Sequence, residues 1–245
     1  MIILKNKNKL FYHNFYIQLS IILYFFLSLL SIGCTSFYNI KHECFSGNCK
    51  NGYGKAIYSK FPISYFAAYE GKWLEGKRHG KGKYIIPNSY TYEGEFINDL
   101  FEGKGKEKIF YHQLDNSKWI HIYEGNWHNG TKNGKGVYKT YKNSELYTSY
   151  DGNWKCGKKH GKGIFRTKGI DYRFYDKNIF QRSQEGLENY FFIFEGEFES
   201  DLFKEGKCIY TFDSGCKYTG KCNKYGKPID YELYKDAYRG YCNNR

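Results

Sequence analysis

Lysine between two glycines is the residue pattern that most invites a chemical interpretation. Gly-Lys-Gly occurs four times, and its lysines are Lys81, Lys104, Lys135 and Lys162. In a phosphate-binding loop the lysine is followed by Ser or Thr at the start of a helix. None of the four triplets continues in that way. We therefore interpret these lysines as candidate anion contacts on a surface and not as a nucleotide-binding loop.

Other residues of catalytic type do not form a known constellation. His79 and His160 precede two of the triplets, while Glu102 and Asn133 precede the other two. We interpret a position that accepts such different side chains as structural. The serines lack the Gly-x-Ser-x-Gly setting of an activated nucleophile. The sequence therefore predicts a protein that is not an enzyme and that holds no cofactor and no metal.

Cysteine is the third residue type that could do chemistry, and the chain has eight. Cys44 and Cys49, with four residues between them, suit a local disulfide better than a zinc site, which favours two-residue spacers and a second ligand pair. Four more cysteines occur from Cys208 to Cys242, where their connectivity stays open. Because disulfides persist in oxidising compartments, this content favours an exported chain.

The first 33 residues also favour export. A basic stretch precedes an uncharged run from Ile17 to Gly33, which is typical of a signal peptide or a membrane anchor. The sequence Leu29-Leu30-Ser31-Ile32-Gly33-Cys34 resembles the lipobox of bacterial lipoproteins, and this resemblance implies that Cys34 is lipidated. Ser31 departs from the usual leucine. A plain cleaved signal peptide or an uncleaved anchor explains the same run, so three alternatives remain open.

The charge of the chain bears on its partners. Its formal net charge is +13 at pH 7, and the lysines are scattered and not gathered in one run. Such an excess favours solubility and non-specific attraction to anions. An ordinary solvated surface and a dedicated anion-binding face both remain open. We expect no nucleic-acid partner, because we expect the chain to be exported.

A repeated five-residue pattern organises the middle of the chain. Tyr, an acid, Gly, any residue and an aromatic residue begin at Tyr69, Tyr92, Tyr123 and Tyr150, and in each copy the acid precedes the lysine of a Gly-Lys-Gly by 11 residues. This constancy indicates an internal repeat. In a strand, the Tyr, the Gly and the second aromatic residue fall on one face and the charged residues on the other. Glycine there leaves room for neighbouring rings.

The repeat predicts an all-β fold. We expect an elongated, single-layer antiparallel meander of stacked β-hairpins, each about 23 residues long, which must fold together because a lone hairpin is marginally stable. The acids at positions 70, 93, 124 and 151 are expected to face Lys81, Lys104, Lys135 and Lys162 across strands. The aromatic row predicts a candidate binding face of Tyr69, Trp73, Tyr92, Phe96, Tyr123, Trp127, Tyr150 and Trp154.

The full pattern carries a family resemblance. Tyr-Glu-Gly-x-Trp followed by x-Gly-x-x-His-Gly-x-Gly is complete in residues 69–82 and nearly complete in residues 150–163. It resembles the MORN repeat (membrane occupation and recognition nexus), and with degenerate copies the resemblance covers about residues 49–225. The resemblance implies a rigid platform for protein contacts, often at membranes. Some members of the family have been linked to anionic phospholipids.

These observations divide the chain into segments. Residues 1–33 are predicted to be a signal peptide or membrane anchor, residues 34–48 a tether and an N-terminal cap closed by Cys44 and Cys49, and residues 49–225 the repeat array. An aromatic insert at 168–193 is expected to pack on the sheet, and residues 226–245 to form a C-terminal cap. In the fifth unit we expect one extra turn residue, with Cys208 in place of the second glycine.

The predicted function follows from these parts. We expect a non-enzymatic MORN-repeat scaffold, exported and membrane-anchored in the cell envelope, that presents its sheet for protein–protein interaction. The alternative is a module that binds an anionic phospholipid or a glycan. A secreted or single-pass membrane protein is the alternative for its location. The insert at 168–193 is the first place where we expect a partner site.

Overall fold

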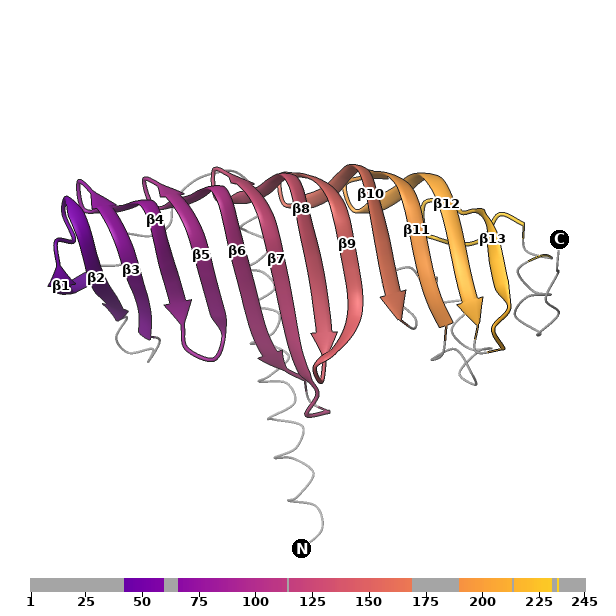
Figure 1. Ribbon diagram of the computed structural model, residues 1–245, viewed down its shortest axis with the longest axis horizontal. Coiled ribbons are helices and arrows are strands. Elements are labelled where there is room, and N and C mark those ends of the chain that lie inside the picture. Colours follow the sequence, from indigo (N-terminus) through magenta and orange to yellow (C-terminus); the bar gives the residue numbers. More distant parts are fainter. Residues whose placement is uncertain are drawn as a thin grey trace, which may run out of the picture. The chain divides into compact units, whose positions relative to one another are not determined.

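The computed structural model describes residues 42–59, 66–113, 115–168, 190–212, 214–230 and Leu233. Within them, thirteen strands follow one another along the chain (Figure 1). Their bounds are β1 His42–Gly47, β2 Gly52–Ser59, β3 Phe66–Leu74, β4 Lys77–Ile86, β5 Tyr90–Ile97, β6 Leu100–His112, β7 Lys118–His128, β8 Thr131–Lys142, β9 Glu145–Lys155, β10 Lys158–Lys168, β11 Tyr190–Glu199, β12 Leu202–Phe212 and β13 Lys217–Lys221. The predicted leader and Cys34 lie outside the described residues.

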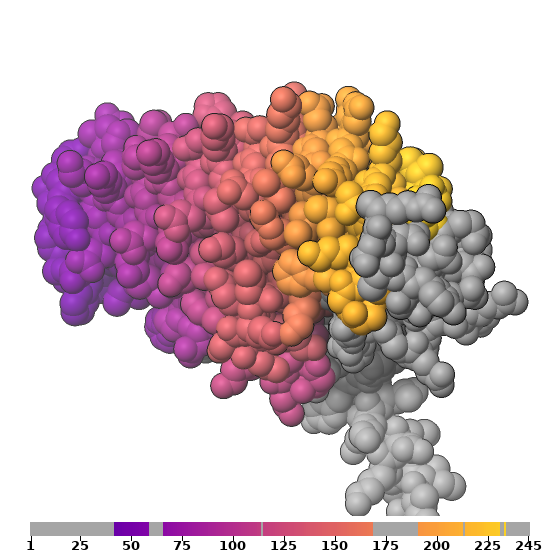
Figure 2. Space-filling view, turned by 45° about the vertical axis from the view of Figure 1, so that its right-hand side comes forward, coloured from indigo at the N-terminus to yellow at the C-terminus, as the bar shows by residue number. Residues whose placement is uncertain are grey.

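All thirteen strands form one sheet, in which their order is their order in the chain. Every neighbouring pair is antiparallel. Figure 2 shows the same succession on the molecular surface, from the indigo N-terminal strands to the yellow C-terminal ones. The sheet is thus a meander of consecutive hairpins, which confirms the predicted fold class.

The second glycine of each Gly-Lys-Gly lies against a tyrosine ring. Gly82 is opposite Gly71 in the pair β3–β4, and a Cβ atom on Gly82 would lie 2.2 Å from the hydroxyl oxygen of Tyr69. That hydroxyl donates a hydrogen bond to the carbonyl of Lys72 at 2.9 Å. The same bond recurs at Tyr92, Tyr123 and Tyr150. Each ring is therefore held across a glycine pair that has no room for a side chain.

The first glycine of each triplet has a different purpose. Gly80, Gly103, Gly134 and Gly161 have φ values between 60° and 81°. In the pair β3–β4 the register shifts at this point, between Gly71 and Trp73. The shift is a β-bulge on the returning strand, and glycine adopts the left-handed conformation there without a Cβ clash.

Rings of successive hairpins pack edge to face along the sheet. Tyr69 meets Trp73 of its own strand at 5.0 Å and 89°, and Phe96 of the next hairpin at 5.1 Å and 80°. The contact to the next hairpin recurs in the pairs Tyr92–Trp127, Tyr123–Trp154 and Tyr150–Phe198. Such pairs contribute about 0.5–1.5 kcal/mol beyond their buried area. The core is therefore one continuous row of rings.

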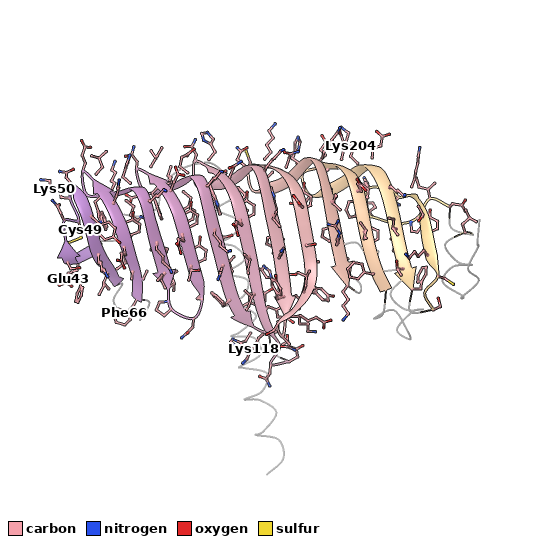
Figure 3. The ribbon with its side chains drawn as sticks, in the orientation of Figure 1. Glu43, Cys49, Lys50, Phe66, Lys118 and Lys204 are labelled. Carbon is pink, nitrogen blue, oxygen red and sulfur yellow. A yellow bond between two sulfur atoms is a disulfide. The ribbon has the colours of Figure 1, made fainter. Side chains whose placement is uncertain are left out.

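Hydrogen bonds also join each hairpin to the one before it. The indole N–H of Trp73 donates to the carbonyl of Gly54 at 3.1 Å, and Trp154 donates to Gly136 at 3.1 Å. Along one long edge, the turns form a ladder of backbone N–H to carbonyl bonds: Gly76 to Lys50, Asp99 to Arg78, Gly130 to Phe101, Gly157 to Lys132 and Asp201 to Lys159. In Figure 3, Lys50 and Lys204 mark this edge.

The two ends of the array differ from its middle. At the N-terminal end, β1 completes a hairpin with β2, and Cys44 forms a disulfide with Cys49, with their Cα atoms 5.8 Å apart. At the C-terminal end, Gly220 stands opposite Cys208, whereas earlier junctions pair glycine with glycine. The register between β12 and β13 is thus shifted by two residues relative to the earlier junctions, and an even shift leaves each side chain on the same face of the sheet. A second disulfide joins Cys208 to Cys222.

The expectation for Cys208 is wrong. Gly206, not Cys208, stands opposite Gly196, and Cys208 stands opposite Phe194. The cause is a smaller bulge: the register shift next to Phe198 adds one residue to β12, whereas the shift in β3–β4 adds two residues to β4. The fifth unit is therefore shorter by one residue and not longer.

The predicted insert is only partly described. Lys168 is the last residue of β10, and residues 190–193 begin β11, so both ends of the predicted segment belong to strands. Residues 169–189 lie outside the described residues. In the predicted C-terminal cap, Pro228 forms an isolated bridge with Cys222, while residues 234–245 also lie outside.

Candidate interaction surfaces

The predicted aromatic binding face is the core of the sheet. Its members expose between 0% and 6% of their surface: Tyr69, Trp73, Tyr92, Phe96, Tyr123, Trp127, Tyr150 and Trp154. Each tyrosine ring lies against a glycine pair and against the rings of neighbouring units. These rings are therefore not an exposed contact surface. Strand alternation identifies their common face but not how closely the units pack.

A half-buried cation that strand alternation does not predict, Lys132, lies among the rings. The ammonium group of Lys132 lies 5.0 Å from the ring centre of Tyr123 and 5.9 Å from that of Trp154. It forms an ion pair with Glu107 at 2.7 Å, and the two side chains are only 18% and 12% exposed. The Tyr90 hydroxyl donates to the same carboxylate at 3.1 Å. Burial, followed by the Glu107 charge, raises the pKa of Tyr90.

The position of Lys132 recurs in every regular hairpin. Its counterparts, each opposite the second aromatic residue of the pattern, are Arg78, Phe101, Lys159 and Phe203. Arg78 lies 5.1 Å from the ring centre of Tyr84 and pairs with Asp99 at 3.0 Å. Lys159 pairs with Asp201 at 3.2 Å. One position is thus filled either by a cation with a carboxylate partner or by a phenyl ring.

The opposite side of the sheet, which we call the charged face, carries a ladder of alternating charge. Lys55, Glu70, Lys83, Glu93, Lys106 and Glu124 stand opposite one another in consecutive strands. Ion pairs form between Lys55 and Glu70 at 3.1 Å, Lys83 and Glu93 at 3.4 Å, and Lys106 and Glu124 at 2.7 Å. The hydroxyl of Tyr53, at 2.8 Å, and then Lys55 lower the pKa of Glu70.

The predicted acid–lysine pairs are corrected by this register. Glu70 stands opposite Lys83 and not opposite Lys81, because the bulge at Gly80 adds two residues to the returning strand. The same offset applies to Glu93, which stands opposite Lys106. The constant interval of 11 residues therefore reports the length of the hairpin and not a contact.

The four predicted anion contacts lie on the charged face and are exposed. Across the junction to the next hairpin, Lys81 stands opposite Glu95, Lys104 opposite Asn126, Lys135 opposite Asn153 and Lys162 opposite Glu197. Ion pairs within the described part of the chain involve other lysines and not these four. Their charges are available to a partner on that face.

The remaining residue types that could do chemistry are cysteine, histidine and the possible metal ligands. Among the described residues, Cys156 is the free cysteine, and it is exposed in the turn between β9 and β10. His79 and His160 are half-buried in β4 and β10. In the described ranges, no three His, Cys, Asp or Glu side chains gather as a metal site would require. The described residues also include no helix long and apolar enough to cross a membrane.

Comparison with known proteins agrees with this geometry. The MORN repeat family model matches residues 69–89, 92–108, 123–144, 150–168 and 194–217. Alsin of Rattus norvegicus is 42% identical over 72 residues, and human Alsin is 38% identical over 84. MORN repeat-containing protein 3 of Xenopus laevis is 34% identical over 71 residues, which are 29% of either chain.

The Alsin matches cover 29% and 34% of this chain but only 4% and 5% of Alsin. The likeness is therefore to a small part of a much longer protein. All five stretches that the family model matches coincide with hairpins that share the glycine pair and the row of rings. The chain belongs to the MORN-repeat family.

Proposed function

We propose that this chain is a non-enzymatic scaffold, exported and tethered to a membrane by its N-terminal segment, that presents the charged face of its sheet to partner proteins in the cell envelope. The observation that carries the proposal is the contrast between the two faces. One face is filled by its own rings, and the other exposes rows of charged side chains on thirteen strands. The uncharged run up to Gly33 and the lipobox-like sequence before Cys34 support the tether.

The way in which the hairpins are joined suits a scaffold. Rings, indole hydrogen bonds and the ladder of turns connect each hairpin to its neighbours. A surface built in this way keeps its charged groups at set distances before a partner arrives. Binding to such a surface costs less ordering entropy than binding to a flexible segment.

Photo-crosslinking in cells tests the scaffold. A photoreactive residue in place of Lys83 or Lys135 on the charged face is expected to capture a defined protein, which then binds the purified full chain. The same residue in place of Asn143, in an exposed turn, is the control. If no charged-face position captures a protein, the scaffold proposal fails.

Mass spectrometry of the mature N-terminus tests the tether. We expect a diacylated Cys34 as the first residue. A chain that still begins at Met1 would contradict the lipoprotein assignment, and an unmodified N-terminus after cleavage would indicate a secreted protein.

The exposed lysines favour a second candidate, a module that binds an anionic phospholipid or a glycan. Lys81, Lys104, Lys135 and Lys162 form no ion pair with a described residue. Co-sedimentation with liposomes and with glycan separates the candidates. Salt-sensitive pelleting that disappears when these four lysines are neutralised would favour the second one.

A further inference from the structure

Strands β6 to β10 carry cations at regular intervals on the charged face. Lys104 on β6, Lys135 on β8 and Lys162 on β10 form one row, and the strands between them contribute Asn126 and Asn153. Because adjacent strands are ~4.8 Å apart, successive cations of this row are ~10 Å apart and the row is ~19 Å long. The side-chain amide of Asn153 donates to the carbonyl of Lys162 at 3.1 Å.

A second row runs parallel to the first. Lys108 on β6, Lys139 on β8 and Arg166 on β10 are linked by register through Ile122 and Ser149. Each lies four residues along its strand from the cation of the first row, which is ~13 Å at ~3.3 Å per residue. We call the six cations of the two rows the cation tract.

The cation tract differs from the ladder beside it. Within the described part of the chain, none of its six cations forms an ion pair, whereas Lys55, Lys83 and Lys106 each pair with a glutamate. Glu197, opposite Lys162 on β11, ends the first row. Asn126 and Asn153 replace the charged residues that other hairpins have at this place, such as Lys72 and Glu95. The tract is therefore a finite surface with unneutralised positive charge.

Between the two rows lies a floor of mixed character. Lys106 and Glu124 neutralise each other at 2.7 Å. Val137 and Ile164 follow on β8 and β10, both half-buried, with the exposed Asp151 between them on β9. The centre of the floor is thus apolar apart from one acid.

We propose that the cation tract binds an acidic α-helix of a partner protein, lying across strands β6 to β10. This inference rests on the proposed function, since it names the partner class of the scaffold. Side chains seven residues apart on a helix are separated by ~10.5 Å, close to the ~10 Å between cations in a row. Alternate residues of an extended strand are only ~6.6 Å apart.

The width of the tract and its floor agree with a helix. A helix with its side chains is ~10–12 Å across, so it fits between rows that are ~13 Å apart. Acidic stripes on its two flanks meet the two rows, and its underside meets Val137 and Ile164. Asp151 requires a basic or amide side chain at the centre of that underside. An anionic membrane fits less well, because Asp151 and Glu197 would face it with the wrong charge.

The test uses the purified full chain and two synthetic peptides of about 16 residues, long enough to cover the tract as helices. The striped peptide is alanine-based and has glutamates seven residues apart on both flanks; the second peptide has the same composition in scrambled order. By fluorescence anisotropy, we expect the striped peptide to bind at least ~10-fold more tightly. The triple variant Lys104→Glu, Lys135→Glu, Lys162→Glu is expected to remove this preference.

A matched control changes three exposed lysines of the same face outside the tract, Lys72→Glu, Lys81→Glu and Lys221→Glu, and is expected to retain the preference. Equal binding of both peptides, or equal loss in both triple variants, would overturn the inference in favour of non-specific attraction. If the chain binds phosphatidylglycerol vesicles but does not bind the striped peptide, the inference is overturned in favour of a membrane. If the crosslinked partner binds the tract variant as well as wild type, the tract fails while the scaffold proposal stands.

Discussion

The aromatic face and the charged face use the same strands but differ in what they can tolerate. On the aromatic face, Tyr92 and Phe96 have no exposed surface, and glycines provide the space for the rings. On the charged face, by contrast, three different residue types, Glu124, Val137 and Asp151, stand opposite one another in strands β7, β8 and β9. The difference teaches that packing restricts the residue types on the aromatic face, while this row of the charged face accepts an acid or an apolar residue.

Alkaline pH should have the largest effect on the stability of the fold, because it ionises the buried tyrosines of the aromatic face. Burial raises the pKa of Tyr58 to about 12, and it raises those of Tyr69, Tyr92, Tyr123 and Tyr150 as well. Because these tyrosines have a higher pKa in the folded than in the unfolded chain, their contribution to stability is fully present below pH ~10. It is lost as the pH rises through the folded-state pKa. Tyrosinate absorbance and circular dichroism should change together. Smooth ionisation near pH ~10 without unfolding would contradict the account.

Removing one ring should have the next largest effect. Tyr92 contacts Phe96, Phe101 and Trp127, so Tyr92→Ala is expected to lower the free energy of unfolding by ~3–5 kcal/mol. Tyr53→Ala, at a ring that is 58% exposed, is the control and should cost less than ~1 kcal/mol. Urea denaturation followed by circular dichroism measures both. Similar losses in the two variants would remove the distinction between the faces.

Breaking the ion pair between Glu107 and Lys132 should have an intermediate effect on the free energy of unfolding. Glu107→Ala leaves the Lys132 ammonium among rings without its carboxylate. Because the two side chains keep some exposure, we expect a loss somewhat below the ~3–5 kcal/mol of a fully buried pair. The double variant Glu107→Leu, Lys132→Met should recover most of that loss, because apolar residues can replace a buried pair. The urea denaturation midpoints of the single and double variants measure this recovery. A double variant as unstable as the single one would contradict this role.

Removing an exposed ion pair should have the smallest effect. Lys106 and Glu124 are 46% and 65% exposed, so Lys106→Ala is expected to change the free energy of unfolding by only ~0.2–1 kcal/mol. The change should shrink further in 1 M salt, where charges are screened within ~3 Å. A loss comparable to that of Tyr92→Ala would show that the charged face carries the fold.

The sequence was sufficient for the fold and for the sorting of residues between faces, because both depend on periodicity. Tyr69, Gly71 and Trp73 alternate with Glu70 and Lys72 in a strand of period two, and the structure places them accordingly. The contacts across strands could not be predicted. They depend on how many residues a bulge absorbs, and the bulge at Gly80 moved the partner of Glu70 from Lys81 to Lys83.

The candidate sites were predicted less well than the fold. Alternation alone does not tell a buried ring from an exposed one, so the sequence predicts a binding face where the structure has the core. Lys132 occurs next to a turn, where a lysine is ordinarily solvated, and only the three-dimensional packing places it over Tyr123. The cation tract combines Lys104 with Lys139 and Arg166, which lie one and two hairpins further along the chain.

The most direct test compares the stability of one glycine variant with that of one charged-face variant. Gly82 has an ordinary φ, and its missing Cβ would lie 2.2 Å from the Tyr69 hydroxyl, so Gly82→Ala reports only the contact with the ring. In urea denaturation, we expect Gly82→Ala to lose at least ~2 kcal/mol. The triple variant Lys104→Ala, Lys135→Ala, Lys162→Ala should lose less than ~1 kcal/mol. The reverse order would contradict the claim that one face folds the sheet and leaves the other free to bind.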